Sequence, residues 1–120
     1  MKIAISSGGT TLEAPVDPRF GRAAKFLLVD TESGVVEVHD NAQNLNAAQG
    51  AGIQAAETVA RLGAGTVITG HCGPKAFRVL RAAGIKVVVG AKGTAAEAVE
   101  AFKKGELRPA DSADVEGHWV

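Results

Sequence analysis

Apolar and polar positions follow two patterns along the chain, short apolar runs and longer amphipathic stretches. The short runs are rich in apolar and β-branched residues and are bounded by polar or glycine-rich segments, which is typical of β-strands. They predict strands at residues 2–7, 26–30, 35–39, 66–69 and 86–89.

The amphipathic stretches predict helices in the second part of the chain. Residues 47–62 place small apolar side chains on one side of a helix, and Gly63 ends the pattern. A second helix is predicted at Pro74–Ala83, because proline suits the first helical position. The third follows Thr94, which has the capping-box spacing to Glu97. A strand, a hairpin and alternating helices and strands together favour an α/β fold.

The order of these elements predicts where a ligand binds. The strands at 26–30 and 35–39 are expected to form an antiparallel hairpin, whereas helical crossovers make the first, fourth and fifth strands parallel. In such sheets ligands bind beyond the carboxyl ends of the strands. Three glycine-rich loops are therefore expected to meet at one edge: Ser6–Thr11, Gly70–Pro74 and Gly90–Thr94.

Length and composition favour one small domain in the cytoplasm. The chain has 120 residues, 46% of them hydrophobic, which suits a single domain at 1–106 followed by a flexible tail at 107–120. No apolar run approaches the roughly 20 residues of a membrane span. The N-terminus lacks a signal-peptide layout, and a lone cysteine suits a reducing compartment. We therefore expect a cytoplasmic protein without a membrane partner.

The charge balance argues against nucleic acid as a partner. Thirteen basic and thirteen acidic residues give a formal net charge of zero, and only 4% of the residues are aromatic. Phosphate backbones require a basic excess, and base stacking requires aromatic side chains.

The candidate chemistry is concentrated in the turn between the fourth strand and the helix at Pro74. Cys72, the single cysteine, and His71 precede that helix, whose N-terminus favours negative charge. Both are candidate metal ligands, and we expect the thiol pKa of Cys72 to lie below the ~8.5 of a free cysteine. The competing interpretations are that Cys72 is a small packing residue and that His71 hydrogen-bonds the loop.

A pocket at this edge is expected to prefer an anion. Arg19, Arg22, Lys75 and Lys92 are close enough in the predicted topology to reach its rim, although Arg22 also suits pairing with a loop carboxylate. The hydroxyl-rich and glycine-rich loops add backbone N–H groups. The candidate binding residues are Ser7, Gly8, Gly9, Arg19, Arg22, Gly70, His71, Cys72, Gly73 and Lys92.

Several segments in order resemble one protein family. Residues 17–23, Asp-Pro-Arg-Phe-Gly-Arg-Ala, followed by Phe26, resemble the signature of the dinitrogenase iron–molybdenum cofactor biosynthesis family. That family includes NifX-like accessory proteins and the C-terminal part of NifB. Residues 2–5, 70–77 and 84–87 also fit, so the resemblance covers residues 1–106.

The resemblance implies a fold and a function. The fold is a three-layer α/β/α ribonuclease-H-like motif, with a five-stranded mixed sheet in the order 3-2-1-4-5 and strand 2 antiparallel. The implied function is to bind or carry an anionic iron–sulfur or iron–molybdenum-type cluster, or its precursor, among cofactor-assembly proteins, as a monomer or homodimer. The cluster is cargo, and no catalytic residue is expected.

Other functions stay open. A phosphate- or nucleotide-binding module would use the same glycine loops, although the chain lacks both standard phosphate-loop spacings. A thiol enzyme would need His71 to act as a base for Cys72, and adjacent residues on a turn rarely face each other. A nuclease is disfavoured, because the first strand carries no carboxylate for a metal.

Overall fold

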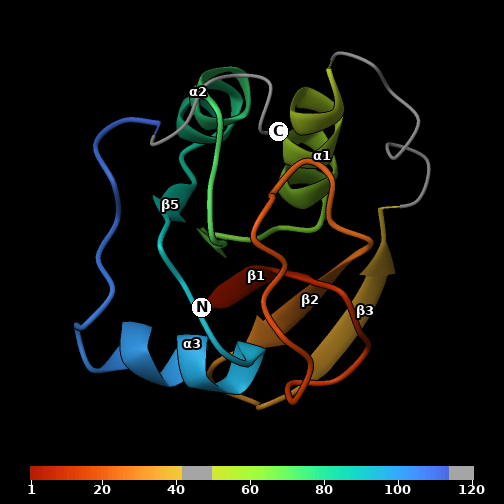
Figure 1. The fold of residues 1–120 in the computed structure, drawn as a ribbon, viewed down its shortest axis with the longest axis vertical. Helices are drawn as coiled ribbons and strands as arrows, with labels where there is room; N and C mark the ends of the chain where they lie inside the picture. The colour runs from red at the N-terminus through yellow and green to blue at the C-terminus, as the bar shows by residue number, and fades with distance from the viewer. Residues whose placement is uncertain (42–49, 114–120) are drawn as a thin grey trace.

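The chain forms a five-stranded mixed β-sheet with helices on both faces, in a computed structural model that describes residues 1–41 and 50–113 (Figure 1). The strands lie in the order β3-β2-β1-β4-β5. They are β1 (Lys2–Ser7), β2 (Lys25–Asp30), β3 (Val36–Asp40), β4 (Thr66–Ile68) and β5 (Lys86–Val88). β2 is antiparallel to both of its neighbours, and β1, β4 and β5 are parallel. The predicted order and strand directions are confirmed.

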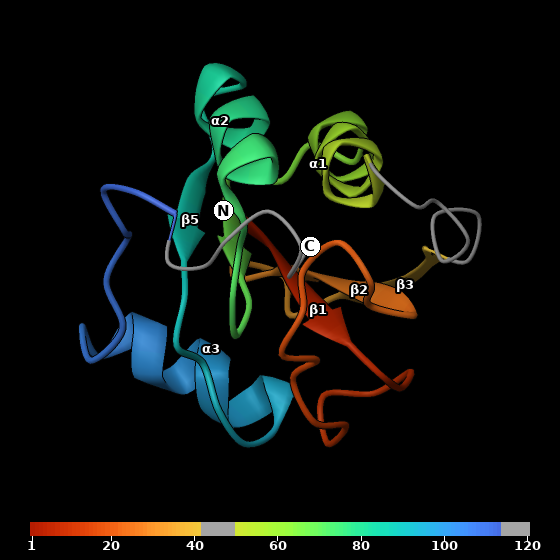
Figure 2. The ribbon, with the colours of Figure 1, turned by 45° about the horizontal axis from the view of Figure 1, so that its top comes forward.

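Two helices cover one face of the sheet and one covers the other. α1 (Ala51–Arg61) and α2 (Pro74–Ala82) lie side by side, and α3 (Ala95–Lys103) lies on the opposite face (Figure 2). The predicted start of the first helix is wrong at Gly50, whose φ of 88° is left-handed and cannot continue an α-helix. Residues 47–49 of that prediction lie outside the described residues.

Alternating side chains of the strands build two separate cores. Ala4, Phe26 and Leu28 face α1 and α2, whereas Ile5 and Leu27 face α3. This alternation follows from the two-residue period of a strand. Each fully buried aliphatic or aromatic side chain stabilises the fold by about 1.5–3 kcal/mol. Both faces of the central strands are therefore buried, as their nearly continuous apolar sequences predict.

The predicted capping box begins α3. Thr94 Oγ1 accepts the backbone N–H of Glu97 at 3.1 Å, and Glu97 Oε1 accepts that of Thr94 at 3.0 Å. The hydrogen bond that the Glu97 carboxylate accepts from the Thr94 backbone N–H lowers the pKa of Glu97. The interaction with the Thr94 side chain lowers it further, by a smaller amount. The third helix thus starts at the predicted residue.

The segment after α3 returns to the sheet. The Ala110 N–H donates to the Val87 carbonyl at 2.7 Å, and the Arg81 guanidinium donates to the Ala110 carbonyl at 3.3 Å. These bonds belong to the described part of the predicted tail, and the domain limit at residue 106 stays a prediction. No helix in the described ranges is both long and apolar enough to cross a membrane.

Candidate functional site

The carboxyl ends of β1, β4 and β5 meet at one edge of the sheet, where the predicted loops begin. A buried pair of hydroxyls joins two of these ends, because Ser6 Oγ lies 2.7 Å from Thr69 Oγ1. Ser6 Oγ is also 2.8 Å from the Asp17 carbonyl oxygen. A serine has one hydroxyl proton, so both bonds form when Thr69 donates to Ser6 and Ser6 donates to Asp17.

Residues 8–24, called the strap here, cross this edge from the α3 side to the α1 side. Figure 1 shows the strap in red and orange in front of the sheet. Its backbone N–H groups donate to carbonyl groups in β1 and in the loops that follow β4 and β5. The bonds run from Asp17 to the Ser6 carbonyl at 2.8 Å, from Phe20 to the His71 carbonyl at 3.2 Å, and from Val16 to the Gly93 carbonyl at 2.9 Å. The long connection is therefore ordered by backbone pairing with the sheet edge.

Gly70 lets the strap lie directly on the end of β4. A Cβ atom at this position would sit 2.7 Å from Pro18 Cα and 2.9 Å from the Pro18 carbonyl oxygen. Real Cβ atoms do not approach backbone atoms so closely, so the contact requires glycine. The functional candidate Gly70 thus has a structural role in placing Arg19, which follows Pro18.

The aromatic residues of the strap region anchor it in the core. Phe20 and Phe26 are fully buried, and their ring centroids lie 5.3 Å apart. Phe20 packs on the α1 and α2 side, so the backbone of Arg19 is held between a buried ring and the Gly70 contact.

Asn41 holds the end of the strap, and it is not among the candidate residues chosen from the sequence. It is fully buried, and its Nδ2 donates to the Gly21 carbonyl at 3.2 Å and the Ala23 carbonyl at 2.9 Å. Its backbone N–H donates to the Ala24 carbonyl at 2.9 Å. Polar residues such as Asp40 and Asn41 are common just after a predicted strand, so no signal in the sequence distinguishes this asparagine.

Truncation of Asn41 is expected to destabilise the fold. Asn41→Ala leaves the buried Gly21 and Ala23 carbonyls without their donor, which costs about 2–3 kcal/mol of unfolding free energy. Asn41→Asp is expected to cost more, because it turns an acceptor toward two carbonyl oxygens. Urea denaturation measures both, with Gln54→Ala on the exposed face of α1 as a control for amide loss. Equal stability of the Asn41→Ala and Gln54→Ala variants would contradict the assigned role.

The N-terminus of α3 is occupied by the strap. The Ala95 N–H donates to the Ala14 carbonyl at 2.9 Å, the Ala96 N–H donates to the Leu12 carbonyl at 2.9 Å, and Thr94 caps the next N–H. This helix end therefore has its first donors satisfied within the chain. The N-cap of α2, Gly73, offers no side-chain cap, and neither does Gly50 at the N-cap of α1.

The predicted loop residues near α3 serve the fold of the strap. Ser7 is buried, and its Oγ accepts the Gly9 N–H at 3.0 Å. Ser7 also bridges Val16, which packs in the α3-side core. A Cβ at Gly9 would meet Ala14 Cβ at 2.7 Å, whereas Gly8 is exposed. The hydroxyl of Ser7 is thus engaged inside its own turn.

Cys72 and His71 lie on different sides of their turn. Cys72 is fully buried in the cluster that contains Phe20 and Phe77, with its Sγ 3.7 Å from the Gly73 carbonyl oxygen. His71 is half-buried and forms a β-bridge with Arg19. Successive side chains of an extended segment point in opposite directions, so this geometry does not bring the two candidate ligands together.

Within the part of the chain that the structure describes, no three His, Cys, Asp or Glu side chains are placed to hold a metal ion. The ligand role of Cys72 and His71 stays a prediction, and for Cys72 it requires the turn to open.

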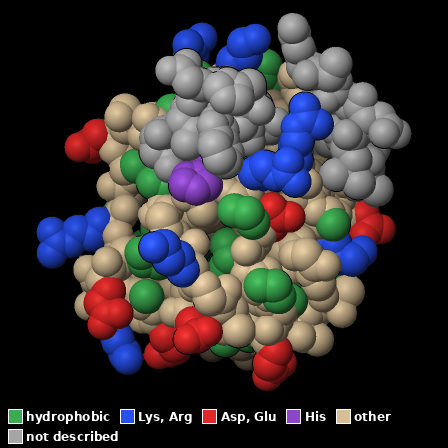
Figure 3. All heavy atoms as spheres, in the orientation of Figure 1, with side chains coloured by type: hydrophobic (Ala, Val, Ile, Leu, Met, Phe, Trp, Pro, Cys, Tyr) green, Lys and Arg blue, Asp and Glu red, His purple; other side chains and the backbone are tan. Residues whose placement is uncertain are grey.

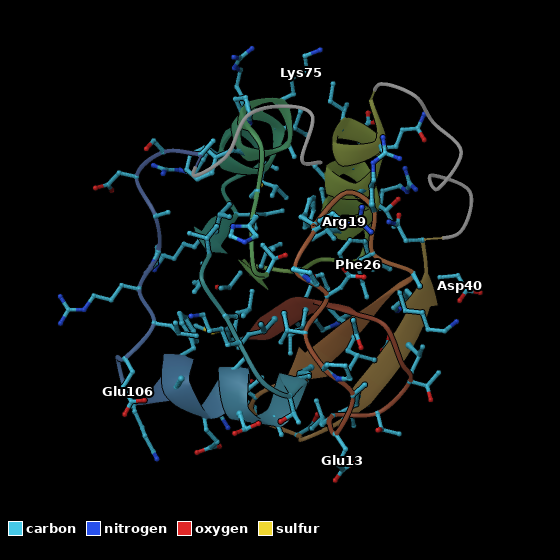
Figure 4. All side chains as sticks on the ribbon, viewed as in Figure 1. Glu13, Arg19, Phe26, Asp40, Lys75 and Glu106 are labelled. Carbon is cyan, nitrogen blue, oxygen red and sulfur yellow. The ribbon has the colours of Figure 1, made fainter. Side chains whose placement is uncertain are left out.

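The basic candidates do not form one cluster. Arg19 lies on the strap beside α1, whereas the side chain of Lys75, in the first turn of α2, extends away from Arg19 (Figure 4). Lys92 is exposed in the loop before α3, and Arg22 is half-buried. Asp17 Oδ1 accepts the backbone N–H of Arg19 at 2.9 Å and so braces the turn of the strap. On this face, acidic side chains are concentrated along the lower rim (Figure 3).

The predicted site residues therefore separate into two groups. The first belongs to the α3 side of the edge and consists of Ser7, Gly8, Gly9 and Lys92. The second belongs to the later part of the strap, from residue 19 on, and to the turn before α2, and consists of Arg19, Arg22, Gly70, His71, Cys72 and Gly73.

Comparisons with known proteins agree with the fold. Residues 1–105 match the model of the family described as dinitrogenase iron-molybdenum cofactor. The structure is similar to the apo form of the orange protein from Desulfovibrio gigas, with a TM-score of 0.93 and 43% identity over 95% of this chain and 96% of that one.

Two further proteins are similar over most of their length. An NMR structure of a candidate NifB protein from Thermotoga has a TM-score of 0.83 and 38% identity, over 97% of this chain and 98% of that one. A protein of Methanocaldococcus jannaschii, described as uncharacterized, is 31% identical over 109 residues, which is 89% of each chain.

Proposed function

Because the chain belongs to the dinitrogenase iron–molybdenum cofactor family, we propose that it binds and carries an anionic metallocluster. The cargo is an iron–sulfur or iron–molybdenum-type cluster or its precursor, exchanged with cofactor-assembly proteins. The similar orange protein was solved in an apo form, a term that presupposes a form with a bound group. In this proposal the protein is a carrier and not an enzyme.

The bridge between Arg19 and His71 is the observation that carries this proposal. It pairs the backbone of Arg19, whose side chain is exposed, with the backbone of half-buried His71, directly before the N-terminus of α2. A helix N-terminus and a guanidinium both favour negative charge. The second group of site residues thus forms a surface that suits an anion, whereas the first group supports the strap.

The buried sulfur of Cys72 shapes the proposed mode of binding. With Cys72 in the core, a cluster at this surface is held by charge and hydrogen bonds, and its metals keep the ligands they arrive with. The thiol-enzyme alternative gains no support, because Cys72 is fully buried and His71 is half-buried on the other side of the turn. A phosphate-type anion fits the same surface and is separated from the proposal by experiment.

Arg19→Ala is expected to weaken cluster binding by about ten- to a hundredfold, because a charge-assisted hydrogen bond contributes about 1.5–3 kcal/mol. The thermal stability should change little, since the Arg19 side chain is exposed. Protein purified without oxygen is incubated with iron, sulfide and reductant, and its visible absorption and iron content are measured. Arg108→Ala removes the same charge from an exposed position after α3 and is the matched control.

Two results would contradict the proposal. One is a wild-type protein that stays colourless and free of iron after this incubation. The other is equal loading of the Arg19→Ala and Arg108→Ala variants. Tight binding of inorganic phosphate by a protein that takes up no iron would favour the phosphate-type module.

A further inference from the structure

β3 ends the sheet on one side and exposes apolar side chains there. It is the outermost strand next to β2. Val38 is 42% exposed and Val35, just before the strand, is 55% exposed. Within the described residues, the only other large hydrophobic side chain that is exposed is Met1. Exposed apolar residues on an edge strand are typical of a surface that pairs with another chain.

The register of the hairpin fixes which backbone groups of β3 point outward. The Asp30 N–H donates to the Val35 carbonyl, and the Asn41 N–H donates to the Ala24 carbonyl, both at 2.9 Å. Backbone groups alternate in direction along an antiparallel strand. Odd-numbered residues of β3 therefore bond to β2, and Val36, Val38 and Asp40 point their N–H and C=O groups outward. No residue in the described ranges pairs with these groups from the outer side.

We propose that this edge pairs with β3 of a second copy of the chain, in an antiparallel arrangement centred on Val38. Such a register places Val38 opposite the second copy's Val38, and Val36 opposite its Asp40. All three outward-pointing residues of β3 then pair with outward-pointing residues. The apolar Val38 side chains meet on the face of the sheet that α3 covers, because Val38 lies opposite Leu27.

Charge selects this register over its neighbours. In the proposed arrangement Glu37 faces the second copy's His39 at a position without backbone hydrogen bonds, where side chains are closest. The neighbouring registers, in which one β3 strand is shifted by two residues against the other, place Glu37 opposite the second copy's Glu37 or His39 opposite its His39. Within one chain Glu37 Oε1 already lies 2.9 Å from His39 Nε2. The proposed dimer therefore alternates carboxylates and imidazoles across the junction.

The proposed dimer leaves both cluster-binding surfaces open. β3 runs in the same direction as β1, because β2 is antiparallel to both. The two β3 strands run in opposite directions, so the carboxyl-end edges of the two copies lie on opposite sides of a continuous sheet. The inference goes beyond the proposed carrier function and does not depend on it.

Sedimentation velocity of the full chain, up to about 1 mM, tests the pairing. The expected result is a concentration-dependent rise toward twice the monomer mass. Val38→Lys places two like charges opposite each other and should weaken association at least about tenfold. Gln54→Lys, at an exposed residue of α1 away from β3, is the control and should associate like the wild type. Thermal melting confirms that both variants fold.

A charge exchange tests the register. His39→Glu should weaken association, because it opposes Glu37 with a second carboxylate. Adding Glu37→His to that variant restores the pair and should restore association. Hydrogen exchange should show the amides of Val36, Val38 and Asp40 becoming protected as concentration rises. A protein that stays monomeric throughout, a dimer that survives Val38→Lys, or equal association of the single and double exchange variants would overturn the proposal.

Discussion

Gly70→Ala is expected to lower the free energy of unfolding by about 3 kcal/mol, the upper range for an overpacked site. The added methyl group would overlap backbone atoms of Pro18, and backbone cannot rotate away as a flexible side chain can. Relief requires the strap to lift from β4, which breaks the bond from the Phe20 N–H to the His71 carbonyl. Urea denaturation measures the loss. Cluster binding should weaken as well, because Arg19 moves with the strap.

Gly8→Ala is the matched control for this substitution. Gly8 is exposed, and a Cβ there would have no atom within 4 Å. Its backbone is also outside the left-handed region, so the variant should lie within about 0.5 kcal/mol of the wild type. If Gly70→Ala were as stable as Gly8→Ala, the close contact between the strap and β4 would not exist in solution.

Cys72 in the folded protein is expected to react with iodoacetamide about a thousandfold more slowly than in urea, because the reagent reaches a buried thiol only through local opening. The side chain has no exposed surface and packs with Phe20 and Phe77. A chain carrying Cys72→Ala and Thr10→Cys places the single thiol at an exposed strap residue and should react at the rate of a free cysteine.

Cluster loading separates the two roles considered for Cys72. If the sulfur is a packing residue, the Cys72→Ala variant still takes up iron and sulfide, whereas Arg19→Ala loses most of its loading. Rapid alkylation of the folded wild type, combined with failure of Cys72→Ala to bind a cluster, would instead establish the thiolate as a ligand. Comparing Cys72→Ala with Arg19→Ala thus distinguishes a cluster ligated by the Cys72 sulfur from one held by the positive charge of Arg19.

Most of the fold could be predicted from the sequence, because its signals are local. The turn at residues 31–34 joins two apolar runs and predicts the hairpin of β2 and β3. Thr94 and Glu97 predict the start of α3, because their spacing is that of a capping box at a helix N-terminus. The direction of β4 and β5 follows from right-handed crossovers, which need only the order of elements. Helix starts were less certain, as the left-handed Gly50 shows.

The candidate site was harder to predict, because it depends on side-chain direction and on contacts between distant residues. The sequence places Cys72 and His71 together but does not say which of them faces the core. It shows Ser7 in a glycine-rich loop, yet the hydroxyl bonds within its own turn. Asn41 lies 18 and 20 residues from the carbonyls that it binds. No local pattern encodes such a contact, and only the assembled fold reveals it.

The many anchor points of the strap also limit where the chain can tolerate added length. Leu12 and Ala14 are tied to the first turn of α3, and Asp17 and Phe20 are tied to β1 and to the turn before α2. An extra residue between Leu12 and Phe20 would break the spacing between these anchors. Gly8 and Thr10 are exposed and precede the first anchor to α3. A peptide tag or a fluorescent reporter would therefore be accommodated at Thr10. There it would report whether the strap is bonded to the sheet edge, without breaking those bonds.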